Sequence, residues 1–268
     1  MKLIFLDIDG TLTVPGENVP PQSALDAVRA ARRNGHKVLI CTGRSWTMTE
    51  SVAAYGFDGV ICSAGGYIVL GGEVLYDHPM DADELRRVLD VMKSPDIFCI
   101  LESKALTFAD ADAEIFDGAN SEALRWRKML TESFNISPMR DYNGEPVYKV
   151  SFLSLRRAAL ERPRQLLQDR YQFCLQDFLL GDTVNGELIN RDFNKGAAIR
   201  RVCEYLGAPV ADTIGFGDSM NDLDMIETAG IGVCMGNGSP ELKRRADKVC
   251  PPVESDGLAA AFRELGLV

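Results

Sequence analysis

The chain is poor in histidine, has no closely spaced cysteine pair and has no long apolar run. With 2 histidines in 268 residues, a metal centre built from several histidines is disfavoured. The 7 cysteines are scattered without a C-x-x-C pair, so we expect reduced core cysteines rather than disulfides or a zinc site. The N-terminal apolar run, Leu3–Leu6, is too short for a signal peptide, and no later run approaches a membrane span. We therefore expect a cytoplasmic protein with no membrane partner.

The chain also lacks an excess of positive charge. Its formal net charge is -10, whereas a nucleic-acid surface needs basic side chains that displace counterions from phosphates. Nucleic acid is therefore not an expected partner. The same charge repels a phosphorylated metabolite, so such a substrate would need local positive charge from a metal ion or a lysine. With 46% hydrophobic and 25% charged residues, the composition is that of an ordinary globular protein.

Strand and helix patterns alternate at both ends of the chain, which is typical of βαβ units and a parallel sheet. The first part has predicted strands near 2–7, at Lys37–Cys41 and at Val60–Cys62, helices near 22–33 and from Ser45, and a hairpin of Tyr67–Leu70 and Glu73–Tyr76. The last part has predicted helices at Lys195–Leu206 and from Asn221, Pro240 and Asp256, with strands at Thr213–Phe216 and Ile231–Met235. We predict a doubly wound, Rossmann-like α/β core formed by residues 1–80 and 188–268.

Between these two parts the pattern changes. Four apolar residues have the spacing of one helix face: Leu85, Val88, Leu89 and Met92. A polar, helix-rich stretch runs to about Leu130, and another helix is predicted near 156–169. Strands are predicted at Ile97–Leu101, Leu106–Phe108, Tyr148–Leu153, Tyr171–Leu175 and Phe178–Leu180. Residues 81–187 are therefore expected to form an inserted α+β domain.

Two carboxylates, Asp7 and Asp9, follow the first apolar run in the sequence L-I-F-L-D-I-D-G-T-L. Side chains two residues apart on an extended chain point the same way, so both could face one site that holds a metal ion or a phosphate. The alternative is a strand-ending turn, in which the glycine supplies an unusual backbone angle and the aspartate a local hydrogen bond. The rest of the chain must decide between these interpretations.

Three further segments are expected at the same edge of the sheet, because ligands of open α/β sheets lie beyond the carboxyl ends of the strands. They are Thr42-Gly43-Arg44, Asn194-Lys195-Gly196 and the run from Gly217 to Asp222. A phosphate monoester would suit them. Lys195 supplies a point charge, Thr42 a hydroxyl donor, and Asp218 a carboxylate for Mg²⁺, with Asp222 as a further ligand or an orienting group.

These motifs, D-I-D-G-T-L, T-G-R, N-K-G and G-D-S-M-N-D, resemble those of the haloacid dehalogenase-like phosphatases in type and order. More narrowly the chain resembles the Cof-type sugar phosphatases, which carry a large type IIB cap between the second and third motifs. The resemblance extends to the tail, V-C-M-G-N and E-L-K. It implies a Mg²⁺-dependent phosphatase that acts on a small phosphorylated metabolite and selects it with the cap.

The resemblance also implies roles for individual residues. Asp7 is the nucleophile that forms an aspartyl-phosphate, and Asp9 is the general acid and base. Mg²⁺ is held by the Asp7 carboxylate, the Asp9 main-chain carbonyl and Asp218, with Asp222 as a further candidate. The phosphoryl group is bound by four residues: Thr42, Gly43, Lys195 and Asn221. Arg44 is a candidate contact to the substrate or the cap.

The chain departs from the pattern at Ala64-Gly65-Gly66, where relatives often carry Asn-Gly-Ala, and at Gly238 in place of an alanine. The leaving group is expected to contact the cap, whose candidates Glu102, Lys149 and Asp182 the sequence does not rank.

Two alternative functions stay open. A phosphomutase is suggested because D-I-D-G-T-L-T resembles the phosphomannomutase opening, although G-D-S-M-N-D lacks the longer insertion of that group. A non-catalytic, phosphate-binding regulatory protein is the other. A cysteine phosphatase is disfavoured because Thr47 stands where its loop after Cys41 needs an arginine. The sequence leaves the oligomeric state open.

Overall fold

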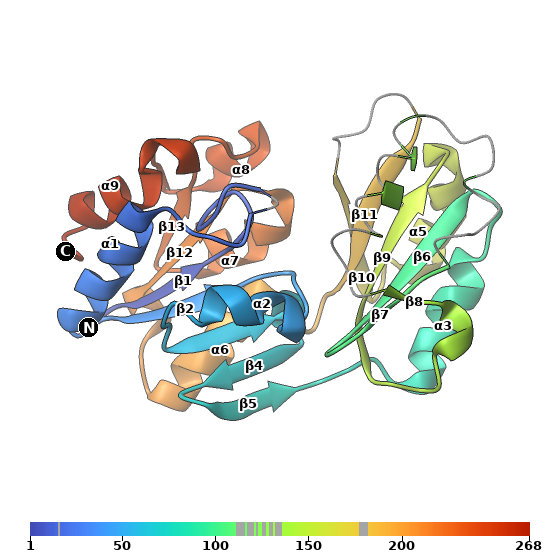
Figure 1. The fold of residues 1–268 in the computed structure, drawn as a ribbon, viewed down its shortest axis with the longest axis horizontal. Coiled ribbons are helices and arrows are strands. Elements are labelled where there is room, and N and C mark those ends of the chain that lie inside the picture. The colour runs from blue at the N-terminus through green and yellow to red at the C-terminus, as the bar shows by residue number, and fades with distance from the viewer. Residues whose placement is uncertain are drawn as a thin grey trace. The chain divides into compact units, whose positions relative to one another are not determined.

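A computed structural model describes residues 1–15, 17–110, 136–176 and 182–268, together with residues 116, 121, 123, 124, 127, 128 and 131. The chain divides into two compact units (Figure 1). Unit 1 comprises Met1–Asp77 and Asp192–Val268, and unit 2 comprises His78–Arg191. In the described part of the chain, no helix has both the length and the apolar character needed to cross a membrane.

Unit 1 is built on an eight-stranded sheet with the order β14-β13-β12-β1-β2-β3-β4-β5. These strands, in chain order, are β1 Leu3–Leu6, β2 Lys37–Cys41, β3 Gly59–Cys62, β4 Tyr67–Leu70, β5 Glu73–Asp77, β12 Thr213–Gly217, β13 Ile231–Cys234 and β14 Lys248–Val249. The strands from β14 to β3 are parallel, and β4 and β5 form an antiparallel edge. Leu6 lies level with Phe216 on β12 and Ile40 on β2. The segments after β1, β2 and β12 therefore leave the sheet at one edge.

Helices cover both faces of this sheet. They are α1 Gln22–Arg33, α2 Trp46–Ala53, α6 Lys195–Leu206, α7 Leu223–Thr228, α8 Pro240–Arg245 and α9 Gly257–Glu264. Apolar residues of α6 and α7 pack with Leu3, Phe5 and Leu39. On the other face the rings of Phe216 and Phe262, the latter on α9, pack edge to face with their centroids 5.5 Å apart. Successive side chains of a strand point to opposite faces of the sheet, so the two sets of contacts lie on different faces. Helices on both faces of a mainly parallel sheet confirm the predicted doubly wound core.

Unit 2 contains a six-stranded sheet with the order β10-β11-β9-β6-β7-β8. The strands are β6 Ile97–Ser103, β7 Thr107–Phe108, β8 Ile136–Ser137, β9 Val147–Ser154, β10 Tyr171–Gln176 and β11 Val184–Asn190. All described pairings are antiparallel except β7 with β8. Helices α3 Ala82–Met92 and α5 Glu161–Leu167 contribute to an apolar cluster with Leu101, Val150 and Phe152. Unit 2 is thus α+β in character.

Several element boundaries differ from the predicted ones for local reasons. The helix expected from Asn221 begins at Leu223, because Met220–Asp222 forms a 3-10 turn. The last helix begins at Gly257, because Asp256 has a left-handed φ of 56°. The polar, glycine-containing strand β11 was not predicted, and it carries unit 2 to Arg191. The strand predicted at Phe178–Leu180 and most of the helix-rich stretch before Leu130 lie outside the described residues.

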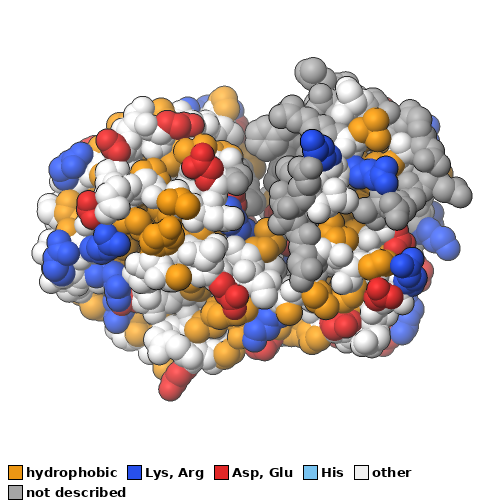
Figure 2. Space-filling view, in the orientation of Figure 1, with side chains coloured by type: hydrophobic (Ala, Val, Ile, Leu, Met, Phe, Trp, Pro, Cys, Tyr) orange, Lys and Arg blue, Asp and Glu red, His pale blue; other side chains and the backbone are white. Residues whose placement is uncertain are grey.

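The surface carries both signs of charge. On the face drawn in Figure 2, acidic and basic side chains are both scattered over the described part of the chain. The excess negative charge is therefore not gathered into one acidic patch on this face.

Asp58, just before β3, supports the sheet through a charged contact. It accepts hydrogen bonds from Arg32 Nε at 2.9 Å, Arg32 Nη2 at 3.0 Å and the Val38 amide at 2.9 Å. Burial raises its pKa, but the contacts with Arg32 and the Val38 amide outweigh burial, so the net pKa lies below its ordinary value. A lowered carboxyl pKa contributes stability above the pKa of the unfolded chain, and this contribution is lost as the pH falls through the folded pKa.

We therefore expect Asp58→Asn to lower the free energy of unfolding by about 1 kcal/mol at neutral pH, a value discounted because Arg32 is partly exposed. The difference from the wild type should shrink as the pH falls through the lowered pKa of folded Asp58, because the carboxyl group is then protonated in both states. Urea unfolding of both proteins at several pH values measures this difference in the free energy of unfolding. A difference that stays constant from neutral to acidic pH would contradict the assigned role.

Candidate active site

The first strand ends at Leu6 and delivers Asp7 to the carboxyl edge of the sheet. The Asp7 amide still donates to Phe216 O at 3.0 Å, which holds the residue in line with β12. The chain then turns, because the Thr11 and Leu12 amides both donate to Ile8 O and Gly10 has φ 82°. The strand therefore ends before Asp9, so strand alternation does not determine the direction of its side chain.

The Asp9 carboxylate is held by Arg44 from the loop after β2. Arg44 Nη2 donates to Asp9 Oδ1 at 2.6 Å and Arg44 Nε donates to Asp9 Oδ2 at 2.8 Å. Arg44 is fixed in turn by Asn18, since its Nη1 donates to Asn18 Oδ1 at 2.5 Å. Such a two-pronged contact orients a carboxylate more strongly than a single bond does. In this structure Arg44 thus contacts a predicted catalytic residue.

Lys195 is brought to the site by the start of α6. Asn194 caps this helix, because its Oδ1 accepts from the Ala197 amide at 2.8 Å. At Gly196 a Cβ atom would lie 2.4 Å from Asp224 O on α7, so only glycine allows the two helices to approach this closely. Lys195 is 1% exposed, and its Nζ donates to Asp7 Oδ1 at 2.7 Å and to Asp222 Oδ1 at 2.5 Å. Lys195 is therefore a buried residue paired with two carboxylates, and not a solvated lysine on the helix surface.

Asp222 is fully buried and both of its carboxylate oxygens are engaged. Oδ1 accepts from Lys195, while Oδ2 accepts from the Asp218 and Ser219 amides, each at 3.0 Å. Together with the Ser219 side chain, these bonds form a capping box at the Met220–Asp222 turn. The contacts suit an orienting role better than a ligand role, since its carboxylate shapes the loop that presents Asp218. Ser219 was not predicted, although Ser-x-x-Asp is a recognisable capping pattern.

Asp218 contributes a carboxylate oxygen that has no hydrogen-bond donor. Its Oδ1 is buried and accepts no hydrogen bond in the described part of the chain. The carboxylate fits against Gly10, where a Cβ atom would lie 2.3 Å from Asp218 Oδ2, so the glycine of D-G-T makes room for it. The Gly10 loop is itself held by Asn237, whose Nδ2 donates to Gly10 O at 2.8 Å. Asn237 belongs to the motif V-C-M-G-N, and no role was predicted for it.

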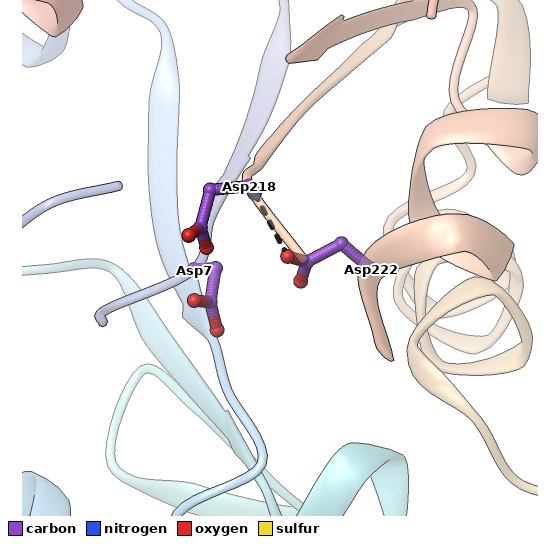
Figure 3. Close-up of side chains that lie close together, drawn as sticks. All are labelled: Asp7, Asp218 and Asp222. Carbon is purple, nitrogen blue, oxygen red and sulfur yellow. Dashed lines mark hydrogen bonds between the residues drawn. The ribbon is translucent and has the colours of Figure 1, made fainter. Parts of the chain in front are cut away.

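Asp7, Asp218 and Asp222 form the carboxylate cluster of unit 1 (Figure 3). One ligand atom from each lies within 4.8 Å of the others. Burial raises the pKa of Asp7 well above its ordinary value, and the Lys195 charge only partly opposes this. Burial, and then the charge of Asp222, raises the pKa of Asp218 to about 7. The negative charge of these carboxylates is therefore only partly offset by Lys195. A cation that binds oxygen ligands fits here, because Asp218 Oδ1 is a buried acceptor with no donor among the described residues.

The remaining predicted residues make local contacts. The Thr42 amide donates to Ile61 O at 2.9 Å, and the Thr42 hydroxyl oxygen accepts from the Arg44 amide at 3.2 Å. Gly43 is buried beside it. Asn221 Oδ1 accepts from Ser219 Oγ at 2.7 Å. The structure thus joins Lys195, Asp7 and Asp222 by direct bonds, with Asp218 adjacent, whereas Thr42 bonds to the neighbouring strand β3 and to its own loop, and Asn221 bonds to Ser219 in its own loop.

The departure at Ala64 lies in the loop after β3. Ser63 and Ala64 have φ values of 48° and 54°, a left-handed conformation that asparagine adopts more readily than alanine. The Ser63 amide donates to Arg44 O at 2.8 Å and the Ala64 amide to Thr42 O at 3.0 Å. This strained turn therefore supports the Thr42-Gly43-Arg44 loop through its backbone, a contact that needs no particular side chain.

Comparison with known proteins identifies the family. Residues 4–262 match the sequence profile of the haloacid dehalogenase-like hydrolases. The chain belongs to this family. YkrA of Bacillus subtilis (strain 168) is 32% identical over 276 residues, which cover 100% of this chain and 98% of YkrA. Phosphatase YwpJ of the same organism is 29% identical over 290 residues, covering 99% and 100% of the two chains.

A solved structure of a related protein also has the same fold as this chain. The haloacid dehalogenase subclass IIB sugar phosphatase BT4131 superposes with a TM-score of 0.78 at 22% identity, covering 100% of both chains. At this identity the match establishes the fold. The predicted family and fold class are therefore confirmed, and the predicted enzyme class, a phosphoric monoester hydrolase, agrees with the relatives.

Proposed function

We propose that this hydrolase is a Mg²⁺-dependent phosphatase that cleaves a small phosphorylated metabolite, a sugar phosphate, through an aspartyl-phosphate on Asp7. The observation that carries the proposal is the buried ammonium group of Lys195, which bonds to Asp7 at 2.7 Å beside the unpartnered Asp218 carboxylate. A carboxylate that attacks a dianionic phosphoryl group needs positive charge at the point of attack. The name of phosphatase YwpJ, which is similar over the whole chain, supports the same reaction.

The first step transfers the phosphoryl group to the enzyme. An Asp7 oxygen attacks phosphorus, the bond from phosphorus to the leaving oxygen breaks, and Asp9 gives its proton to that oxygen. Lys195 holds Asp7 in place and offsets the charge of the transferred group. Its pKa is raised well above the ordinary value, because the charges of Asp222 and Asp7 outweigh the opposing effect of burial. The ammonium form is therefore the one present during turnover.

The second step releases phosphate. Asp9 takes a proton from a water molecule whose oxygen attacks the phosphorus of the aspartyl-phosphate. The bond between phosphorus and the Asp7 oxygen breaks, so that Asp7 is again a free carboxylate. Arg44 orients Asp9 through its two-pronged contact. Thr42, Gly43 and Asn221 are assigned to the phosphate oxygens by the family motif. Asp7, Asp218 and the Asp9 main-chain carbonyl would hold Mg²⁺, which supplies positive charge against the phosphate oxygens.

Removal of the metal tests the proposal. We expect the purified protein to hydrolyse p-nitrophenyl phosphate in the presence of Mg²⁺ and to lose nearly all activity in EDTA, because Lys195 alone leaves the carboxylate cluster with excess negative charge. Added Mg²⁺ should restore the rate. Activity that persists in EDTA after dialysis would contradict the assigned metal dependence.

Product analysis separates this reaction from a mutase reaction. With a hexose 1-phosphate and a bisphosphate activator, a phosphatase releases inorganic phosphate. Accumulation of the hexose 6-phosphate would instead identify a phosphomutase, and the absence of turnover on a broad panel of phosphate esters would favour a binding protein.

A further inference from the structure

Residues 236–239, which we call the β13 loop, connect β13 with α8 in unit 1 (Figure 1). The loop contains the asparagine of the tail motif V-C-M-G-N, to which the proposed reaction gives no part. In the sheet, β12 separates β13 from β1. Because these parallel strands end at one edge, the β13 loop lies beside the loop after β12 and within reach of the loop after β1.

Asn237 connects the β13 loop to the D-G-T turn. Its Nδ2 donates to Gly10 O at 2.8 Å, and its Oδ1 accepts from the Val253 amide at 3.0 Å. Both ends of the side-chain amide are thus bonded to main-chain groups of other segments. Gly10 shares a planar peptide group with the Asp9 carbonyl. The bond from Asn237 therefore restrains the part of the turn that presents the Asp9 carbonyl oxygen.

The β13 loop also holds the main chain of Asp218. The Ser239 amide donates to Asp218 O at 2.8 Å. At Gly238 a Cβ atom would lie 2.9 Å from Asp218 O and 2.6 Å from Cys234 Sγ. Gly238, where the chain departs from the family pattern, therefore lets the loop pack closely against Asp218.

The β13 loop is itself anchored by α8. Lys243, the lysine of the motif E-L-K, donates from Nζ to Gly236 O at 2.6 Å. Ser239 caps the helix, because its hydroxyl oxygen accepts from the Leu242 amide at 3.2 Å. The two tail motifs thus build one anchored segment, and this segment bonds to two of the loops that form the carboxylate cluster.

We propose that Asn237 is a positioning residue for the cation site of the carboxylate cluster. The inference rests on the proposed function, in which Asp7, Asp218 and the Asp9 main-chain carbonyl hold Mg²⁺. Asp9 and Asp218 belong to loops that follow different strands, and the β13 loop bonds to both of these loops. Asn237 therefore acts on the cation through the relative position of its ligands, and contributes no ligand of its own.

The size of the expected effect follows from the cation. Mg²⁺ demands a near-ideal arrangement of its oxygen ligands, so a small displacement of one loop against the other weakens binding. Hydrogen-bonded groups that orient metal ligands contribute about 10–100-fold to metal affinity. Loss of the bond from Asn237 to Gly10 O frees the D-G-T turn to move relative to Asp218. The protein then keeps every ligand but binds the cation less tightly.

A Mg²⁺ titration of the metal-free protein, followed by its melting temperature, tests the proposal without any turnover. The increase in melting temperature with Mg²⁺ concentration gives the dissociation constant, and NaCl at equal ionic strength corrects for the effect of salt. We expect Asn237→Ala to raise the Mg²⁺ dissociation constant about tenfold or more. The Mg²⁺ concentration that gives half the maximal rate on p-nitrophenyl phosphate should rise by a similar factor.

Asn34→Ala is the matched control. Asn34 also donates from Nδ2 to a distant main-chain oxygen, Leu267 O at 3.0 Å, but it lies between α1 and β2 at the opposite edge of the sheet. Both variants should lower the melting temperature of the metal-free protein, because each loses a hydrogen bond. The Mg²⁺ dissociation constant of Asn34→Ala should stay within about twofold of the wild type.

A second variant, Asn237→Asp, separates position from charge. Its carboxylate can still accept from the Val253 amide but cannot donate to Gly10 O. Negative charge added near the cluster would by itself tighten cation binding. A raised Mg²⁺ dissociation constant in this variant therefore reports the lost bond to Gly10, and it decides the question if Asn237→Ala does not fold.

The proposal is overturned if either folded Asn237 variant binds Mg²⁺ as tightly as the wild type, or if Asn34→Ala weakens binding as much as Asn237→Ala. A wild-type melting temperature that Mg²⁺ raises no more than NaCl does would instead refute the cation site, which is a failure of the proposed function and not of the role of Asn237.

Discussion

Replacing Asp7 with Asn is expected to lower kcat for p-nitrophenyl phosphate by about four orders of magnitude or more, as removal of a catalytic nucleophile does in other hydrolases. The amide keeps the size of the side chain but cannot form an acyl phosphate. Acid quenching with radiolabelled substrate should trap the label on the wild-type protein and leave the variant unlabelled. This measurement reports the covalent step itself, independently of the overall rate.

The folded state should tolerate this change. Burial raises the pKa of Asp7, so the carboxylate is costly in the metal-free protein, and a neutral amide removes that cost. We expect the melting temperature of metal-free Asp7→Asn to equal or exceed that of the wild type. Asp26→Asn on α1 is the control, because Asp26 is exposed and bonds to Gln22 and Arg29 on the same helix. Retained turnover in Asp7→Asn would refute the nucleophile assignment.

Replacing Lys195 with Met is expected to lower both stability and activity. It removes the cation that bonds to Asp7 and Asp222 and leaves two buried carboxylates facing each other. Breaking a buried ion pair from one side costs about 3–5 kcal/mol. Loss of the charge that offsets phosphoryl transfer should lower kcat/KM by about a thousandfold. Denaturant unfolding of the metal-free protein at neutral pH measures the first effect, and p-nitrophenyl phosphate kinetics measure the second.

A double variant separates these two effects. Adding Asp222→Asn to Lys195→Met removes one of the two unpaired charges, so most of the lost stability should return while the activity stays low. Lys248→Met is the control, since Lys248 pairs with Glu264 at the surface. It should change stability by less than about 1 kcal/mol. A double variant as unstable as Lys195→Met would show that unpaired carboxylates do not cause the loss.

The core elements were predictable because local patterns and tertiary packing agree there. The strand Lys37–Cys41 was predicted with its observed bounds, since its apolar run is buried on both faces of a parallel sheet. The strand β11 escaped prediction because Asn185, Gly186 and Glu187 interrupt its apolar pattern. Its pairing with β9 and β10, which are distant in sequence, stabilises it instead.

The sequence by itself determined which chemical groups gather at the carboxyl edge of the sheet. Asp7, Lys195 and Asp218 each directly follow a strand or begin a helix, and parallel strands bring such positions to one edge. The family assignment follows from the same motifs and is confirmed by the profile match over residues 4–262. Local sequence was sufficient here because the order of motifs along the chain encodes the order of the βαβ units.

Only the tertiary structure decided how these groups contact one another. After the turn that follows Leu6, the Asp9 carboxylate bonds to Arg44, and the Asp222 carboxylate bonds to the two amides of the loop that carries Asp218. In unit 2, Lys149 on β9 pairs with Glu102 on β6 and Glu187 on β11, and Glu187 was not singled out in the sequence. Side-chain pairing across such distances depends on strand register and burial, which the spacing of residues along the chain does not specify.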